Sequence, residues 1–405
     1  MRSVSLFFVI MMCCIAAHLF AAPFEVVGAA GKPSVSTSTV RHDGSENARL
    51  FLKVLGDNLR RSGYFNVLDS TSASVMVSGQ VTGSDGIAAN VTVTLSSGRF
   101  TWSRRGAADE TRDVAHALCD IIVKNVTGNP GMASAPLVFV GKRNGQTDIY
   151  SCDADGGRLR RLTQDGKTCL SPAWKIDRSG FFYTGFLKNA PFIYHVSFSR
   201  NGEMSRDVVS ALPGLNSCPS PSPDGRSLAL VLSVSGNVEL YVMDLATRKL
   251  TRLTHTPHAN EASPAWSPDS QSLAYVSDLS RAPQVYTIGR GERTGKRLVF
   301  NLAESVSPSW GSDGRIAFCG RPSGGAYGIY VMTPGGTPSQ ISPNTGDSYE
   351  EPSWAPDQRH IVATRVRGRA RSLVILDTKG DSSVDLTPSG GEWYLANWAR
   401  KNDKL

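Results

Sequence analysis

The residues best suited to metal chemistry lie in loops between short apolar stretches. His255, His258 and Glu261 could supply nitrogen and oxygen ligands, but two histidines three residues apart constrain little outside a helix. A second group of candidate ligands is the acidic cluster Asp347, Glu350 and Glu351. Carboxylate oxygens suit hard cations, although acidic side chains are commonly solvated without one. We therefore predict no metal site.

Two basic segments could instead contact anions. Residues 289–296 read Gly-Arg-Gly-Glu-Arg-Thr-Gly-Lys, but this glycine spacing is not that of a phosphate loop, and Arg297 stands where the motif requires a hydroxyl. A hairpin turn is the better interpretation. Residues 365–371 carry arginine at every second position, which places these side chains on one side of an extended segment. They could bind an anionic partner or form a solvated hairpin tip.

The sequence predicts no catalytic residue and no cofactor. It lacks a Gly-x-Ser-x-Gly elbow, which counts against a hydrolase with a separate catalytic domain. After residue 22, cysteines occur at Cys119, Cys152, Cys169, Cys218 and Cys319. Their spacing fits no zinc site, and although a disulfide between Cys152 and Cys169 is conceivable, buried thiols are the simpler interpretation. The formal charge of +8 is scattered along the chain, so we predict no nucleic-acid partner.

A repeat of the form Pro-x-Trp-x-x-Asp organises the last two thirds of the chain. Its tryptophan recurs at Trp174, Trp266, Trp310, Trp354 and Trp398. Pro221 takes the same place in one further copy, and neighbouring copies are about 45 residues apart, the spacing of four-stranded propeller blades. Each copy is followed by short apolar stretches separated by turns, which predicts strands rather than helices.

The ends of this repeated segment complement each other. The first cycle begins at Leu137 without a tryptophan strand before it, whereas Trp398 has no apolar strand after it. Pairing the two would complete a sixth blade and leave no bare edge. We therefore predict that residues 133–405 form an all-β six-bladed β-propeller, closed by pairing of the C-terminal strand with the first blade.

The preceding residues, 45–132, predict a small α+β domain. Apolar residues at helical spacing follow Ser45 up to Gly63, and a second helix is expected over residues 111–126. Strands are expected over residues 64–68, 75–81, 87–95 and 99–103. A chain of 405 residues is long enough for both domains.

Residues 1–22 read as a signal peptide, with a positive start at Arg2, an apolar run and a cleavage position near Ala21 or Ala22. A retained membrane anchor is the weaker alternative because the run is short for a span. Residues 23–44, rich in glycine, serine and threonine, predict a flexible N-terminal arm. We thus expect a protein exported to the periplasm, peripheral to the membranes rather than integral.

Loops that enter the tryptophan strands lie on one face of such a propeller, and exposed functional residues are found on loops more often than on the scaffold. The predicted partner-binding residues on this face are Asn216, Ser217, Cys218, Asn260, Glu261, Ser305, Tyr349 and Glu350.

Two segments of the first domain carry a resemblance to a known family. Residues 54–65 read Val-Leu-Gly-Asp-Asn-Leu-Arg-Arg-Ser-Gly-Tyr-Phe, and residues 112–122 read Arg-Asp-Val-Ala-His-Ala-Leu-Cys-Asp-Ile-Ile, followed by Thr127 and Gly128. Together with the Pro-x-Trp-Ser-Pro-Asp repeats, this chain resembles the TolB family of periplasmic propeller proteins in the bacterial Tol-Pal envelope system. The departures are Pro221 in place of an aromatic residue, and Lys175-Ile-Asp177, which lacks the usual serine-proline.

The resemblance implies a non-enzymatic, monomeric adaptor that supports outer-membrane integrity and envelope constriction at cell division. It would bind the peptidoglycan-associated lipoprotein Pal through the propeller face and TolA through the arm. Carried to this chain, the arm residues are Phe24, Glu25, Val26, Val27 and Gly28. A paralogue that binds another envelope protein, or a propeller hydrolase with acids or histidines converging in the channel, remains the alternative.

Overall fold

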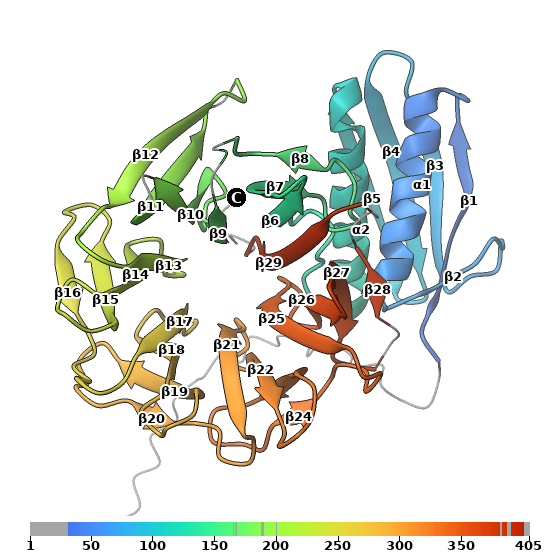
Figure 1. Ribbon diagram of the computed structural model, residues 1–405. Helices are drawn as coiled ribbons and strands as arrows, with labels where there is room; N and C mark the ends of the chain where they lie inside the picture. Colours follow the sequence, from blue (N-terminus) through green and yellow to red (C-terminus); the bar gives the residue numbers. More distant parts are fainter. Residues whose placement is uncertain are drawn as a thin grey trace, which may run out of the picture. The chain divides into compact units, whose positions relative to one another are not determined.

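A five-stranded sheet with two helices on one face forms the first part of the computed structural model (Figure 1). The strand order is β2-β1-β3-β4-β5, with β1 (Ser34–His42), β2 (Asn66–Val67), β3 (Val75–Thr82), β4 (Ile87–Leu95) and β5 (Gly98–Gly106). The helices are α1 (Glu46–Arg61), the short 3-10 helix η1 (Ala108–Glu110) and α2 (Thr111–Thr127). The structure describes residues 31–164, 166, 168–187, 190–199, 201–380, 383–386 and 390–400, and Lys32–Leu405 form one unit.

Both helices begin and end where local chemistry favours it. The Ser45 side chain accepts the backbone N–H of Ala48 at 3.3 Å and so caps the start of α1. Gly128 ends α2 in the left-handed region, with φ of 76°, which glycine adopts without a steric penalty. The apolar faces of α1 and α2 pack with β3 and β4 in one buried core. These elements confirm the predicted helices.

Strand β1 corrects the predicted extent of the flexible arm. The composition predicts an arm over residues 23–44, but Ser34–His42 form a strand that pairs in parallel with both β2 and β3. Val35 and Ser36 are fully buried, because α1 returns the chain to a parallel neighbour and covers this strand. A run of serines and threonines conceals two core positions. The predicted arm residues 24–28 lie outside the described residues.

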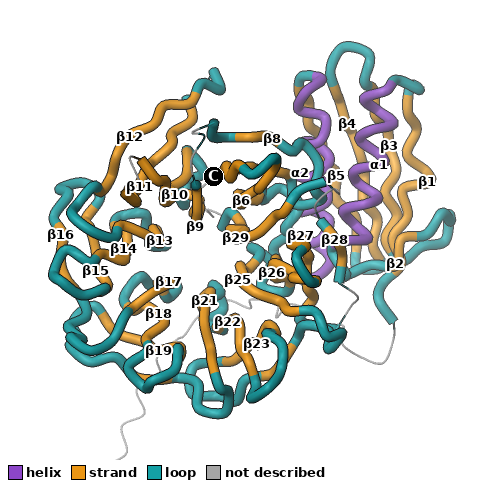
Figure 2. The backbone as a smooth tube through the Cα atoms, in the orientation of Figure 1, coloured by secondary structure: helices purple, strands orange, loops and turns teal. Residues whose placement is uncertain are grey.

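Six four-stranded sheets follow, arranged around a centre like the blades of a propeller (Figure 2). The first two are β29 (Glu392–Trp398), β6 (Leu137–Arg143), β7 (Gln146–Cys152), β8 (Arg160–Arg161), and β9 (Cys169–Trp174), β10 (Gly180–Leu187), β11 (Ala190–Phe198), β12 (Met204–Ser210). The next two are β13 (Asn216–Pro221), β14 (Ser227–Leu232), β15 (Glu239–Asp244), β16 (Leu250–Arg252), and β17 (Glu261–Trp266), β18 (Ser272–Ser277), β19 (Gln284–Gly289), β20 (Lys296–Arg297). The last two are β21 (Glu304–Trp310), β22 (Ile316–Arg321), β23 (Gly328–Met332), β24 (Ser339–Gln340), and β25 (Ser348–Trp354), β26 (His360–Arg367), β27 (Ala370–Asp377), β28 (Val384–Asp385).

The ring closes as predicted. The C-terminal strand β29 pairs antiparallel with β6, and Trp398 lies opposite Leu137. The sheet β29-β6-β7-β8 therefore contains strands from both ends of the propeller segment, which removes two free edges.

The repeated tryptophans fill the spaces between neighbouring blades. Trp266 and Trp398 are almost fully buried, and each indole N–H donates to a backbone carbonyl 2.9 Å away, of Ser220 and Ala135 respectively. A large flat ring with one polar edge suits a seam between sheets, provided that this edge finds an acceptor. The tryptophan motif is thus structural.

Residues 289–296 connect β19 and β20 as the predicted hairpin. No disulfide joins any two of Cys119, Cys152, Cys169, Cys218 and Cys319, so the conceivable bond between Cys152 and Cys169 is not formed. Among the described residues, no helix is both apolar and long enough to cross a membrane.

Candidate protein-binding site

The innermost strand of every blade has a bulge at its third or fourth residue. Each pairs with its neighbour through a register shift, and one residue in each shift has φ between 49° and 57°. These residues are Ser171, Cys218, Ser263, Ser307, Glu351 and Leu395. Such bulges re-aim the side chains at a strand end, and a non-glycine residue holds this conformation only where its surroundings enforce it. The predicted binding residues lie at these bulges or up to three residues before them.

Four of the predicted residues are buried: Asn216, Glu261, Ser305 and Tyr349. The Asn216 side-chain oxygen accepts the Ser210 hydroxyl at 2.7 Å, and its amide nitrogen donates to the carbonyl of Leu212 at 2.7 Å. Ser305 accepts the backbone N–H of Val285 at 2.9 Å. These hydrogen bonds tie the loops between blades to the inner strands, and they support the face from below.

Glu261 shares a buried polar site with Glu239 on β15. The Thr256 hydroxyl lies 2.8 Å from Glu261 Oε2 and 3.2 Å from Glu239 Oε2, while Arg252 donates to Glu239 at 2.6 Å. Burial, together with the neighbouring Glu239, raises the pKa of Glu261 to about 7. Burial acts in the same sense on Glu239, but hydrogen bonds from Thr254, Thr256 and Arg252 outweigh it and lower that pKa. The pair therefore holds one proton readily near neutral pH.

The other four predicted residues remain accessible: Ser217, Cys218, Asn260 and Glu350. Asn260 is exposed and held in place, since its backbone N–H and side-chain amide donate to the Asp278 carboxylate at 2.8 and 3.1 Å. Glu350 is half-buried, and its side chain makes no hydrogen bond or ion pair with another described residue. Together they come from three blades, on β13, before β17 and on β25.

Two further carboxyl groups, those of Glu304 and Glu351, lie near Glu350. Glu304 begins β21 and forms an ion pair with Arg321. Hydrogen bonds from Arg321 and Tyr327 lower the pKa of the Glu304 carboxyl. Glu351 is held by Thr364 and by the Leu395 N–H, both at 2.8 Å, and burial raises its pKa. No group of three potential metal ligands meets here within the described part of the chain, and His255 and His258 are both exposed. This arrangement offers hydrogen bonds and negative charge to a partner surface.

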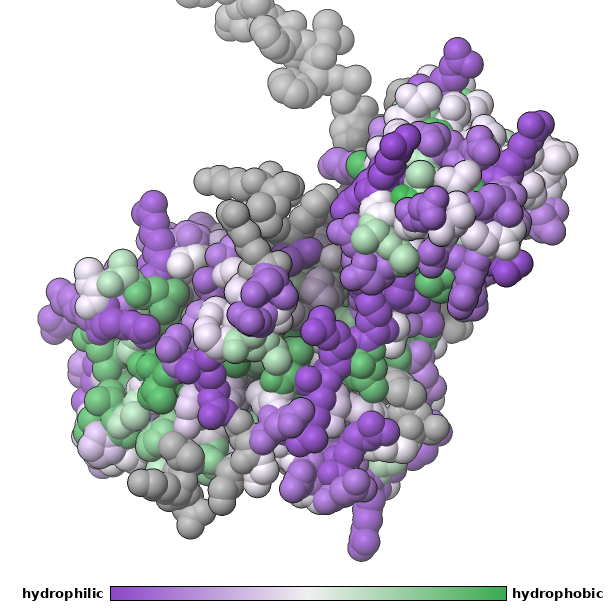
Figure 3. Space-filling view, turned by 90° about the horizontal axis from the view of Figure 1, so that it is seen from above, coloured by the Kyte–Doolittle hydropathy of each residue, from purple (hydrophilic) through white to green (hydrophobic). Residues whose placement is uncertain are grey.

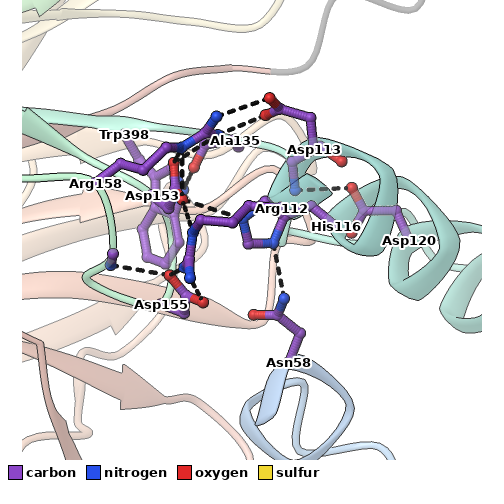
Figure 4. Close-up of polar contacts among 12 residues, drawn as sticks. Asn58, Arg112, Asp113, His116, Asp120, Ala135, Asp153, Asp155, Arg158 and Trp398 are labelled. Carbon is purple, nitrogen blue, oxygen red and sulfur yellow. Dashed lines mark hydrogen bonds and ion pairs between the residues drawn. The ribbon is translucent and has the colours of Figure 1, made fainter. Parts of the chain in front are cut away.

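The one group of potential metal ligands found among the described residues lies elsewhere, where α2 meets the turn after β7 (Figure 4). One ligand atom each of His116, Asp153 and Asp155 lies within 4.8 Å of the others. Arg112 occupies this site: its Nε lies 2.7 Å from Asp153 and its Nη2 lies 2.5 Å from Asp155. Arg158 pairs with Asp153 at 2.9 Å as well. Two guanidinium groups thus supply the positive charge that a metal ion would bring.

His116 connects α1 with the turn after β7. Its Nδ1 lies 2.7 Å from the Asn58 amide nitrogen, and its Nε2 lies 3.2 Å from Asp153. Burial acts to raise the pKa of Asp153, but hydrogen bonds from His116, Arg158 and Arg112 lower it well below the usual range. The sheet-and-helix domain and the propeller are therefore joined by a buried ionic network.

A second polar cluster contacts the end of α1. Arg359 stacks on the Tyr64 ring, 4.5 Å from its centroid, and pairs with Asp377 at 2.6 Å. His360 contacts Asp357 at 2.6 Å and Asp377 at 3.4 Å. Burial opposes protonation of His360, but the two carboxylates prevail and raise its pKa to about 9. This histidine is charged at neutral pH.

Sequence reasoning assigned no role to either cluster. Arg112, Asp113 and His116 fall within the family-like segment 112–122, but nothing in the sequence identifies the turn after β7 as their partner. The basic residues over 365–371 are partly engaged within the blade, since Arg365 pairs with Asp385 at 2.8 Å and Arg367 with Asp347 at 2.7 Å.

Comparisons with known proteins agree with this architecture. A family model described as the TolB beta propeller domain matches residues 123–402. The Tol-Pal system protein TolB of Desulfosudis oleivorans is 30% identical over 152 residues, which are 38% of this chain and 34% of that protein. A TolB homolog of Chlorobium luteolum is 28% identical over 236 residues, 47% of this chain and 54% of the homolog. These alignments span about a third to a half of the relatives' lengths.

A solved structure extends the likeness across both domains. The crystal structure of TolB from Acinetobacter baumannii matches with a TM-score of 0.80 and 25% identity, covering 92% of this chain and 98% of that one. The matched family model itself covers well over half of the present sequence. This chain belongs to the TolB β-propeller family.

Proposed function

We propose that this protein is a non-enzymatic adaptor of the Tol-Pal envelope system in the periplasm. It binds a Pal-like lipoprotein through the propeller face and a TolA-like protein through residues 24–28, and so supports outer-membrane integrity and constriction at division. The main supporting observation is a set of accessible side chains at or just before the bulges of the inner strands. These are Ser217, Cys218, Asn260 and Glu350. No cofactor takes part.

The geometry suits rigid docking. The buried side chains of Asn216 and Ser305 fix the loops beneath this face, and Asp278 holds Asn260. A surface that is ordered before binding loses little conformational entropy when the partner arrives. For the arm, which lies outside the described residues, an added strand is the favoured mode, with Phe24, Val26 and Val27 filling pockets.

The test is calorimetric titration with the soluble domain of the Pal-like lipoprotein from the same bacterium. We expect the double variant Asn260→Arg, Glu350→Lys to weaken binding at least tenfold, because two bulky cations replace contact groups. Gln271→Arg, in the exposed turn between β17 and β18, is the control and should bind within twofold of the unchanged protein.

Deleting residues 24–28 completes the experiment. It should abolish binding of a TolA-like protein and leave the titration with the Pal-like domain unchanged. If the double variant and the control bind the Pal-like domain with equal affinity, the proposal that the propeller face binds this partner is refuted. A deletion that retains TolA-like binding would refute the assignment of the arm.

A further inference from the structure

Strand β5 has a free edge in the α+β domain (Figure 1). It pairs with β4 over nine consecutive residues, from Gly98 opposite Leu95 to Gly106 opposite Ile87, without a register shift. No described strand pairs with its other side. An uninterrupted edge of this kind presents a row of backbone donors and acceptors to any chain that can lie beside it.

The side chains of β5 alternate between two faces. Phe100 and Trp102 lie opposite the buried Val93 and Val91, and both rings pack at the margin of the core while remaining partly exposed. The other face carries exposed polar side chains, those of Arg99, Thr101, Ser103 and Arg105. A strand added beside β5 would therefore meet aromatic surface on one face and hydroxyl and guanidinium groups on the other.

The charge of this edge is of one sign. Arg99, Arg104 and Arg105 are exposed, and none of them makes a hydrogen bond or ion pair with another described residue through its side chain. The strand carries no acidic residue. Figure 3 shows that the visible surface of the α+β domain is mainly hydrophilic.

The other outer edges of the described sheets differ from β5. The strand β2 and the outermost strands of five blades have only two or three residues, a length that offers little to a pairing chain. The strand β12 has seven residues and exposes Met204 and Val208, but Arg206 and Asp207 adjoin there with opposite charge. Thus β5 combines the longest free edge with a single sign of charge. Two copies of β5 side by side would bring arginines together, which disfavours pairing with itself.

We propose that the β5 edge is a docking site for an extended acidic segment of a partner protein, which adds as an antiparallel sixth strand. Backbone hydrogen bonds supply the affinity, as in other cases of strand addition. Carboxylates opposite Arg99, Arg104 and Arg105, and β-branched side chains over Phe100 and Trp102, supply the selectivity. This site is separate from the propeller face and does not depend on the function proposed for it.

A short peptide tests this directly on the full chain. The fluorescein-labelled probe is Glu-Glu-Thr-Val-Thr-Val-Glu, which places its glutamates opposite the three arginines and its valines over the rings in the antiparallel register. We expect saturable binding by fluorescence anisotropy that weakens as salt is raised. Changing Arg99, Arg104 and Arg105 together to Glu should weaken binding at least tenfold. Arg49→Glu, Arg293→Glu, Arg369→Glu makes the same charge change at exposed sites elsewhere and should bind within twofold of the unchanged protein.

Two N-methylated probes distinguish strand addition from charge attraction. Only alternate residues of a paired strand direct their N–H groups to the neighbouring strand. One probe is N-methylated at its valines and the other at its threonines. We expect one of these two probes to lose binding and the other to retain it. Undiminished binding of both methylated probes, or no binding of the unmodified one, would overturn the proposal. So would vesicles containing phosphatidylglycerol that bind through these arginines when the peptide does not. Arg→Gln changes at the same three positions provide a second variant if the Glu changes disturb folding.

Discussion

At the scale of single residues, the most unusual group is the carboxyl of Glu261. It is almost fully buried beside Glu239, and the Thr256 hydroxyl lies between them. Two carboxylates in one dry site cannot both be charged without a large cost, so one of them retains its proton. Thr256 belongs to the loop that leads to Asn260, so this site adjoins the proposed binding face.

The stability of the protein should therefore depend on pH through this residue. The folded pKa of Glu261, about 7, lies above the ordinary value of 4.5, so its stabilising contribution is complete below pH 4.5 and is lost as pH rises through 7. As pH rises from 5 to 8, the stability of Glu261→Gln relative to that of the unchanged protein should therefore increase by about 2 kcal/mol. Thermal unfolding at both pH values measures this, with Glu350→Gln as the control. A pH-independent difference would contradict the shared proton.

The repeated motif made the positions of the blades predictable from the sequence, but the direction in which the neighbouring side chains point was not predictable. The tryptophan spacing identified the blades, yet Asn216, Glu261, Ser305 and Tyr349 are buried beneath the face that they were predicted to form. A loop composition cannot reveal that a bulge at the next residues turns these side chains inward. Whether Ser217, Cys218, Asn260 and Glu350 contact a partner stays a prediction.

At the scale of elements, the contact of α2 with the turn after β7 joins two architectures. Arg112 is the central group, because it neutralises both Asp153 and Asp155. Neither element announces this contact in the sequence, since ion pairs between distant segments follow no periodic pattern. Strand β1 illustrates the same limit: Val35 and Val40 alone mark it as part of the core. The helices and the alternating strand β4 were predictable because their apolar spacing is regular.

Arg112→Met should weaken this junction strongly. The change leaves the buried Asp155 without its ion pair, which costs about 3 kcal/mol for a group so poorly solvated. Arg60→Met is the control, because its pair with Asp57 on α1 is exposed and contributes less than about 1 kcal/mol. Chemical denaturation measures both losses, and limited proteolysis of the connection at residues 128–136 reports separation of the domains. Equal losses in the two variants would contradict a structural role for Arg112.

At the scale of the whole molecule, ring closure depends on β29. Every other inner strand is preceded and followed along the chain by another strand of the propeller, whereas β29 is followed by no further strand in the described chain. The strand is held by its ladder with β6, by the Trp398 ring in the seam, and by the backbone N–H of Trp398, which donates to the Ser353 hydroxyl on β25 at 3.0 Å. The terminal seam is therefore the point at which the ring opens most easily.

Trp398→Ala should open this seam. Removal of a buried indole costs about 4 kcal/mol. Beyond the strand, only the hydrogen bonds of Ala399 and Arg400 hold the described part of the chain in place. Trp310→Ala removes an equivalent indole from an inner strand that continues into β22, so the loss of stability is similar but the strand stays in place. Carboxypeptidase digestion followed by mass spectrometry should trim β29 in the first variant only. Trimming in both, or in neither, would contradict the special role of this seam.

The pairing of β29 with β6 also orders events in the life of the chain. Synthesis runs from the amino end, so β6 leaves the ribosome before the five intervening blades and its partner β29 leaves after them. Until then Leu137 and its neighbours lack the inner strand that covers them, and the ring cannot close. A complete ring therefore forms only after the strands of all six blades have been synthesised.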